Sequence, residues 1–177
     1  MNLALLALRL VVGLTLAAHG AQKLFGWFGG HGIDGTAAGY ERMGLRPGKF
    51  NAWLAGLAEC LGGLLIALGL VTPLGAAALI GVMTVAVATV HLRNGFFAAQ
   101  NGFEFNLVMA SAAFALAGIG AGGWSLDHAL GIHMTGAGWA LGALAVGVLA
   151  GLGAVGSGRL ASAPVRRRAY REETPGA

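Results

Sequence analysis

Six polar side chains that could take part in proton chemistry stand inside or at the ends of apolar stretches of this sequence. They are His19, Gln22, Lys23, Glu59, His91 and Glu104. Histidine titrates near neutral pH and can donate a hydrogen bond through either ring nitrogen, and a carboxyl group can act as an acid or a base. Ionisable groups are costly among apolar residues, so we expect these groups to pair with one another or to serve a function.

Helical spacing predicts that three of these side chains share a face. His19 precedes Gln22 by three residues and Lys23 by four, which places all three on one side of a helix. Glu59 lies about 9 Å along a helix from Trp53, and His19 lies at a comparable depth in the preceding apolar stretch. If consecutive stretches are antiparallel helices, all six side chains lie toward one end of the bundle and can line one pocket.

The elements that must position these groups are membrane helices. Of the 177 residues, 56% are hydrophobic and only 10% are charged, whereas about 25% charged is usual for a soluble domain. So few charges cannot cover a soluble surface, which excludes an ordinary cytosolic enzyme and a nucleic-acid-binding domain. The 32 glycines fit a membrane bundle, in which small residues let helices approach closely.

Five apolar stretches predict five membrane crossings, because a bilayer core of about 30 Å needs roughly 20 helical residues. The stretches are 3–24, 53–71, 74–92, 105–119 and 137–155, of which the fourth is short. Thr72 and Pro73 predict a tight turn, with Thr72 as the N-cap of the third helix and Pro73 at its first position.

These stretches predict an all-α integral membrane protein with two parts. Residues 1–156 form a helical transmembrane domain, and residues 157–177 form a basic, disordered tail. The fifth stretch carries two GxxxG pairs, Gly138/Gly142 and Gly147/Gly151, which predict a helix-packing face.

Lysine and arginine residues predict the orientation. With five crossings, one membrane side holds the loops 25–52 and 93–103 and the C-terminal tail. With the adjacent helix ends, these regions carry ten of the 11 Lys and Arg residues, and the other side carries only Arg9. Because basic regions stay in the cytoplasm, we expect a multi-pass protein of the cell membrane with a cytoplasmic C-terminus and the N-terminus outside.

Several stretches of the sequence form a recognisable pattern. They are HGAQKLFGWFGG at 19–30, WLAGLAECLGGLLIALGL at 53–70, HLRNGFFAAQNGFEFNLV at 91–108 and GGWSLDHALG at 122–131. Their order resembles the DoxX family of small bacterial membrane proteins over about residues 1–131. The resemblance implies a four-helix core, to which this chain adds a fifth stretch at 137–155. It also implies redox or sulfur chemistry, because similar proteins are membrane subunits of a thiosulfate:quinone oxidoreductase or partners of a superoxide dismutase and a sulfurtransferase.

The six polar side chains admit three interpretations. In a structural network, Glu59 pairs with Lys23, and the histidines bond to backbone carbonyls or to Glu104. In a quinone site, all six side chains hold the head group, and Glu59, His19 and His91 act as catalytic proton carriers. In a metal site, two histidines and two glutamates would be ligands, but no HxxxH or ExxH spacing supports this, and we predict no metal.

Three further residues stand out inside or beside the apolar stretches. Arg9 and Asp127 are the charged residues on the predicted outer side, and we expect them to form a structural ion pair. Cys60 is interpreted as a small apolar packer or, given the sulfur chemistry of the family, as a persulfide carrier. A single cysteine excludes a disulfide framework.

The leading functional hypothesis is a membrane subunit of a redox system that uses quinone as the electron acceptor, in sulfur or oxidative-stress chemistry. The sequence contains no Fe–S, haem or flavin motif, so the electron donor would be a soluble or membrane redox partner protein or a directly bound reductant. The competing hypothesis is a non-catalytic membrane anchor or assembly factor that recruits a soluble oxidoreductase. The sequence leaves open whether the chain is an enzyme and whether it forms a homo-oligomer.

Overall fold

The computed structural model is an all-α bundle. It describes the backbone of residues 1–173 and the side chains of residues 1–161. Its α-helices are α1 (Asn2–Phe25), α2 (Gly32–Arg42), α3 (Gly48–Leu68), α4 (Thr72–Ala86), α5 (Glu104–Ile119), α6 (Leu126–Ala129) and α7 (Ala137–Glu173). Three 3-10 turns are η1 (Trp27–Gly29), η3 (Leu92–Asn94) and η4 (Ala98–Gln100), and η2 (Val87–His91) continues α4 as a π-helix. No strand occurs in this part of the chain.

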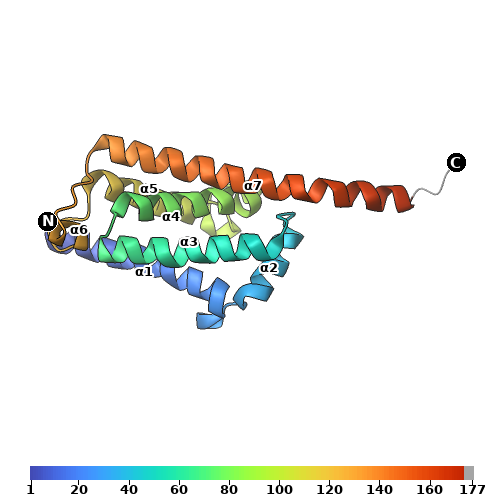
Figure 1. Ribbon diagram of the computed structural model, residues 1–177, viewed down its shortest axis with the longest axis horizontal. Helices are drawn as coiled ribbons and strands as arrows, with labels where there is room; N and C mark the ends of the chain where they lie inside the picture. The colour runs from blue at the N-terminus through green and yellow to red at the C-terminus, as the bar shows by residue number, and fades with distance from the viewer. Residues whose placement is uncertain (174–177) are drawn as a thin grey trace.

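Four helices are long and apolar enough to cross a membrane. They are α1, α3, α4 with its continuation to Asn94, and the Ala137–Ala161 part of α7. Helix α5 has 16 residues, or about 24 Å, and is shorter than a bilayer core. It still runs from one end of the bundle to the other, antiparallel to α4 (Figure 1). The sequence-based fold class, an all-α membrane bundle, is confirmed.

Helix α4 is the centre of the bundle. It packs against α3, α5 and α7, and α3 packs in turn against α1 and α2. The buried core follows from this order: its largest apolar side chains are at most 2% exposed and comprise Leu16, Ile66, Leu79, Ile80 and Leu116. Helices α3 and α7 flank α4 (Figure 1).

Glycine lets α1 and α3 approach at backbone distance. A Cβ atom on Gly20 of α1 would lie 2.5 Å from the backbone nitrogen of Cys60, and one on Gly63 of α3 would lie 2.5 Å from the nitrogen of Ala17. No side chain fits at these points, and the contact depends on small residues. This packing holds the second half of α1 beside the second half of α3.

The two GxxxG pairs of α7 face different surroundings. A Cβ atom on Gly147 or on Gly151 would lie 2.7 Å from a carbonyl oxygen of α4. A Cβ atom on Gly138 or on Gly142 would have no neighbour within 4 Å. The predicted packing face is therefore confirmed for Gly147/Gly151, whereas Gly138/Gly142 lies on the outer side of the helix.

Helix α7 extends past the other helices at one end of the bundle (Figure 1). Its backbone is helical to Glu173, whereas the sequence predicts disorder from residue 157. Alanine, arginine and glutamate have high intrinsic helix propensity, which accounts for the difference. Residues 174–177, the end of the predicted tail, lie outside the described residues, and the division at residue 156 stays a prediction.

Candidate functional site

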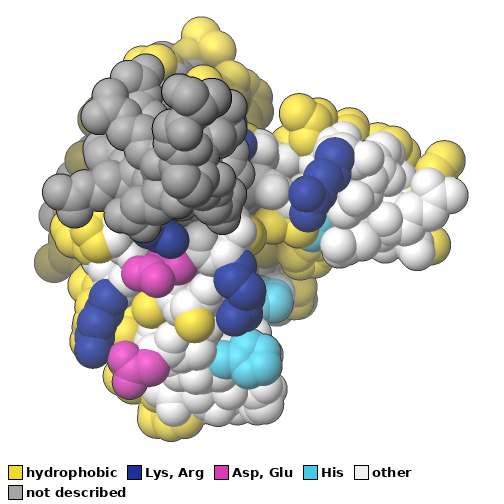
Figure 2. All heavy atoms as spheres, turned by 90° about the vertical axis from the view of Figure 1, so that its right-hand side faces the viewer, with side chains coloured by type: hydrophobic (Ala, Val, Ile, Leu, Met, Phe, Trp, Pro, Cys, Tyr) yellow, Lys and Arg dark blue, Asp and Glu magenta, His cyan; other side chains and the backbone are white. Residues whose placement is uncertain are grey.

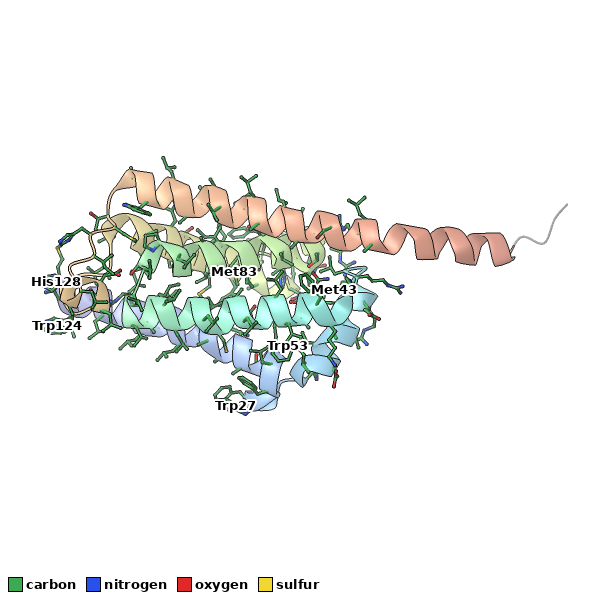
Figure 3. The ribbon with its side chains drawn as sticks, viewed as in Figure 1. Trp27, Met43, Trp53, Met83, Trp124 and His128 are labelled. Atoms are coloured by element: carbon green, nitrogen blue, oxygen red, sulfur yellow. The ribbon has the colours of Figure 1, made fainter. Side chains whose placement is uncertain are left out.

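A cavity of about 320 Å³ lies over α4, between α3 and α7. Most of its lining consists of Ala, Gly, Val and Leu side chains. The polar lining residues come from one end of the bundle, where α1 ends and α2 lies, and they are Lys23, Tyr40, Asn51, Glu59 and Thr89. Met43 and Leu45, from the connection between α2 and α3, line the same end. Figure 3 shows Met43 near the start of α3 at this end. The cavity is thus mostly apolar, with Asn51 and Thr89 toward one end and Glu59 deeper, near the level at which α3 packs against Ala78.

Lys23 and Glu59 form an ion pair in the wall of the cavity. The Nζ atom of Lys23 donates to both carboxylate oxygens of Glu59, at 2.8 Å and 2.6 Å. The Glu59 side chain is 3% exposed and that of Lys23 is 26% exposed. Pairing is what allows a carboxylate to be buried among apolar helices. The pairing expected in the structural-network interpretation is confirmed.

Tyr40 is one of three polar lining residues that the sequence analysis missed, together with Asn51 and Thr89. It belongs to the short helix α2 and reaches the cavity from outside the membrane-spanning helices. Burial raises the pKa of its phenol, and the negative charge of Glu59 raises this pKa further. The hydroxyl group therefore stays protonated at physiological pH and can donate a hydrogen bond into the cavity.

Asn51 and Thr89 also line the cavity, but their donors are used locally. The Asn51 amide donates to the carbonyl oxygen of Pro47 at 2.9 Å, and the Thr89 hydroxyl donates to that of Val85 at 2.8 Å. Thr89 lies in the π-helical segment η2, a kind of irregularity that is frequent at functional sites. Tyr40, Lys23 and Glu59 thus remain as the polar groups best placed to meet a ligand.

His19 and Gln22 bind each other outside the cavity. The Nδ1 atom of His19 lies 3.1 Å from Oε1 of Gln22, and the Gln22 amide donates to the carbonyl oxygen of Phe28 at 3.2 Å. Neither residue lines the cavity, and His19 is exposed. His19 is nevertheless close enough to Glu59 to act on it electrostatically. The hydrogen bonds of His19 and Gln22 therefore link the end of α1 to the turn that follows it.

His91 and Glu104 hold the loop between α4 and α5. The Nδ1 atom of His91 lies 2.8 Å from the carbonyl oxygen of Asn101, and the Glu104 carboxylate accepts the Ala98 N–H at 2.9 Å. Polar groups at helix ends bind the unpaired backbone of the adjacent loop, because that backbone has no helical partner. The convergence of all six side chains on one pocket is corrected: Lys23 and Glu59 line it, and the other four do not.

At the opposite end of the bundle, Asp127 holds the start of α4. Its carboxylate accepts the N–H groups of Val71 at 2.7 Å and Thr72 at 3.2 Å, and the Thr72 hydroxyl at 2.9 Å. Free N–H groups and the helix dipole attract a carboxylate to this position. The cap of α4 is thus supplied by the chain near α6, and not by the side chain of Thr72 as predicted.

Arg9 is buried near Asp127 without a direct bond to it. It is 1% exposed and donates from Nη2 to the carbonyl oxygen of Trp124. Among the described residues, no hydrogen bond or salt bridge joins Arg9 to Asp127, so the predicted direct ion pair is corrected to a longer-range attraction. The Asp127 carboxylate instead accepts three hydrogen bonds at the start of α4. Cys60, in the interior, donates weakly to the carbonyl oxygen of Ala17 at 3.5 Å.

The end of the bundle that holds the polar side of the cavity is also the charged end. Figure 2 looks onto this end and shows Lys and Arg side chains spread over it, with acidic side chains between them. One exposed salt bridge joins Lys49 to Asp34 at 3.1 Å. In the described part of the chain, no group of three or more His, Cys, Asp or Glu residues is arranged to hold a metal ion.

The fold and the cavity define a multi-pass helical membrane protein with an amphipathic pocket. The sequence matches the model of the DoxX family over residues 4–92, about half of the chain, and the chain belongs to this family. It is 31% identical over 144 residues to a Mycobacterium tuberculosis protein called "Uncharacterized membrane protein Rv3486". That alignment covers 75% of this chain and 85% of the relative. No solved structure matches the chain.

Proposed function

We propose that this chain is the membrane subunit of a quinone-linked redox system and that its cavity binds the quinone. The observation that carries the proposal is the cavity itself, whose lining is mostly apolar and includes three neighbouring polar groups, Lys23, Tyr40 and Glu59. Sites for small amphipathic ligands combine an apolar lining with a few placed polar groups. A quinone has the matching shape, with a polar ring and an apolar tail.

In this proposal, each polar group has a separate role. The Tyr40 hydroxyl and the Lys23 ammonium donate hydrogen bonds to a carbonyl oxygen of the ring. Reduction to the quinol adds two electrons and two protons, and Glu59 passes protons to the ring from the aqueous side. His19 is the exposed group that lies electrostatically close to Glu59, and it can supply those protons. The electrons come from a redox partner protein or from a directly bound reductant.

The second candidate function is a non-catalytic membrane anchor or assembly factor for a soluble oxidoreductase. It is favoured by the ion pair, because Lys23 and Glu59 already satisfy each other at 2.6 Å. It is also favoured by the exposed aromatic residues of η1 beside the charged end, where Trp27 is 60% and Phe28 is 71% exposed. In this case the pair only stabilises the helices, and the loops bind the partner.

Purification in a mild detergent separates the two functions. Mass spectrometry of the purified protein identifies the lipids and proteins that accompany it. Quinone at one molecule per chain supports the redox subunit. A soluble oxidoreductase bound without quinone supports the anchor and contradicts the quinone site.

Glu59→Gln tests the proton role directly. It keeps the size and hydrogen-bonding capacity of the side chain but removes its titration, so quinone-coupled turnover should fall roughly 10²-fold or more. Glu104→Gln is the matched control, because Glu104 lies outside the cavity, and it should retain turnover. Thermal unfolding is measured on the same preparations. A destabilised Glu59→Gln protein whose folded fraction keeps full turnover contradicts the catalytic role and leaves Glu59 a structural residue.

A further inference from the structure

The cavity extends along α4 and its continuation η2. Its lining residues there run from Ala77 to Val90, which corresponds to about 20 Å along the helix axis. Glu59 lies toward the Ala77 end of this length, because Gly62, one turn further along α3, packs against Ala78. A compact ring bound beside Glu59 would therefore leave the stretch toward Val90 empty.

Small side chains on both walls keep the cavity open. The α3 wall includes Ala55 and Ala58, and the α7 wall consists of Ala150, Gly151 and Ala154. Helices α3 and α7 each pack against α4, and the cavity occupies the space between them. Longer side chains on either wall would fill this space, so these residues determine what the cavity can hold.

The opening of the cavity faces the side of the bundle. Leu54 of α3 lines the cavity and is 49% exposed, and Ala150 on the opposite wall is also exposed. Both belong to helices that are long and apolar enough to cross a membrane, so their exposed surface meets lipid. The end of the cavity toward Val90 is covered instead by Leu45, which is 2% exposed. Next to it, the N–H of Arg46 donates to the carbonyl oxygen of Gly158 in α7 at 3.2 Å.

We propose that the cavity selects a quinone with a long isoprenoid tail, which enters sideways from the bilayer and lies between α3 and α7. This inference rests on the proposed quinone site. It assigns α7 a specific role as the wall that recognises the tail. Helix α7 lies outside residues 4–92, so this selectivity belongs to a part of the chain that the family model does not cover.

The test compares two quinones with the same ring, one with an isoprenoid tail and one without, in nanodiscs of fixed lipid composition. Affinities are calculated from the concentration of quinone within the bilayer, so that partitioning of the tail into lipid is not counted as binding to the protein. The protein should bind the tailed quinone at least about 10-fold more tightly, roughly 1.4 kcal/mol. Ala154→Leu should remove this preference and leave the affinity for the tailless quinone unchanged. Ala145→Leu, on the exposed side of α7, is the control and should behave like the parent protein.

The possible outcomes separate this inference from the proposed function. Equal affinities for the two quinones, or an unchanged tail preference in Ala154→Leu, overturn the tail site but leave a head-group site. Absence of binding by both quinones overturns the proposed function itself. A phospholipid that stays bound and resists displacement by the tailed quinone also overturns the inference. If Ala154→Leu does not fold, Ala58→Leu on the facing wall repeats the test.

Discussion

Among single residues, the pair of Lys23 and Glu59 dominates the interior of the bundle. Each charge satisfies the other, and Lys23 remains 26% exposed, so the pair connects a buried carboxylate to the outside. Such a pair can stabilise helices and can also hold a ligand, because the ammonium and the carboxylate both face the cavity. Tyr40 distinguishes the two roles, since it lines the same cavity from α2 and its hydroxyl makes no hydrogen bond within the described part of the chain.

The pKa of Tyr40 predicts how stability depends on alkaline pH. Because burial and Glu59 raise this pKa above the ordinary value of 10.0, the unfolded state loses the phenol proton first as pH rises. The contribution of Tyr40 to the free energy of unfolding should be complete below about pH 10 and should decrease above it. Thermal unfolding of the parent protein and of Tyr40→Phe is compared from neutral pH to about pH 11. Identical pH dependence in the two proteins would show that Tyr40 is not buried against Glu59.

Among the helices, α4 depends on groups supplied by other elements at its start and along its middle. Its first N–H groups bind Asp127, which comes from the chain after α5, and its middle is packed against glycines of α7. Its last turn becomes the π-helix η2, which brings Thr89 and Val90 to the cavity. The position of α4, and with it the cavity floor, is therefore determined by contacts distant in sequence.

Asp127→Ala should destabilise the bundle through the start of α4. It leaves the N–H groups of Val71 and Thr72 without their acceptor, and Thr72 is fully buried, so the free energy of unfolding should fall by about 1–3 kcal/mol. Asp34→Ala removes the same group from an exposed salt bridge, where the Asp34 side chain is 82% exposed, and should change nothing measurable. Equal unfolding temperatures for the two variants would contradict the capping role.

The glycines of α7 offer a matched pair of substitutions. Gly151→Ala places a methyl group 2.7 Å from the carbonyl oxygen of Gly81 and should lower the free energy of unfolding by about 1–3 kcal/mol. Gly142→Ala adds the same group where no atom lies within 4 Å, and the higher helix propensity of alanine should leave stability equal or slightly greater. Chemical or thermal unfolding in detergent measures both. A larger loss of unfolding free energy for Gly142→Ala than for Gly151→Ala would contradict the assignment of the packing face to the Gly147/Gly151 side of α7.

The whole molecule has two chemically different ends. Trp27 and Trp53 lie toward the end that holds α2, and Trp124 lies at the opposite end together with His128 (Figure 3). Tryptophan is enriched at both membrane–water interfaces. The basic residues gather at the α2 end, where the polar side of the cavity also lies. The proposed head-group site is therefore close to one aqueous compartment only.

The distribution of charge predicts which compartment that is. Ten of the 11 Lys and Arg residues belong to the α2 end, so this end should be cytoplasmic. A reporter fused after Ala177 should be active only in the cytoplasm, and a reporter at the N-terminus only outside. Cytoplasmic labelling of both ends would mean an even number of crossings. It would point to α5 as the helix that does not span, because α5 is shorter than the four candidate spans.

The sequence by itself determined the properties that follow from local composition. Membrane insertion depends on the apolar character of consecutive residues, so the all-α membrane bundle, the long apolar helices and the shortness of α5 were predictable. Family membership could be inferred from motifs such as those at 19–30 and 53–70. The pairing of Lys23 with Glu59 was also predictable, because two opposite charges in adjacent apolar helices have few other partners.

The tertiary structure decided everything that depends on how the helices rotate and which distant segments meet. His91 and Glu104 were expected in the pocket, but nearby loop backbone binds them instead. Asp127 was assigned to Arg9, but it caps α4. Tyr40 entered the site from a short helix with no distinguishing motif. Which partner each polar side chain binds depends on the distances between groups after the helices have packed. Residue spacing along the sequence does not give those distances.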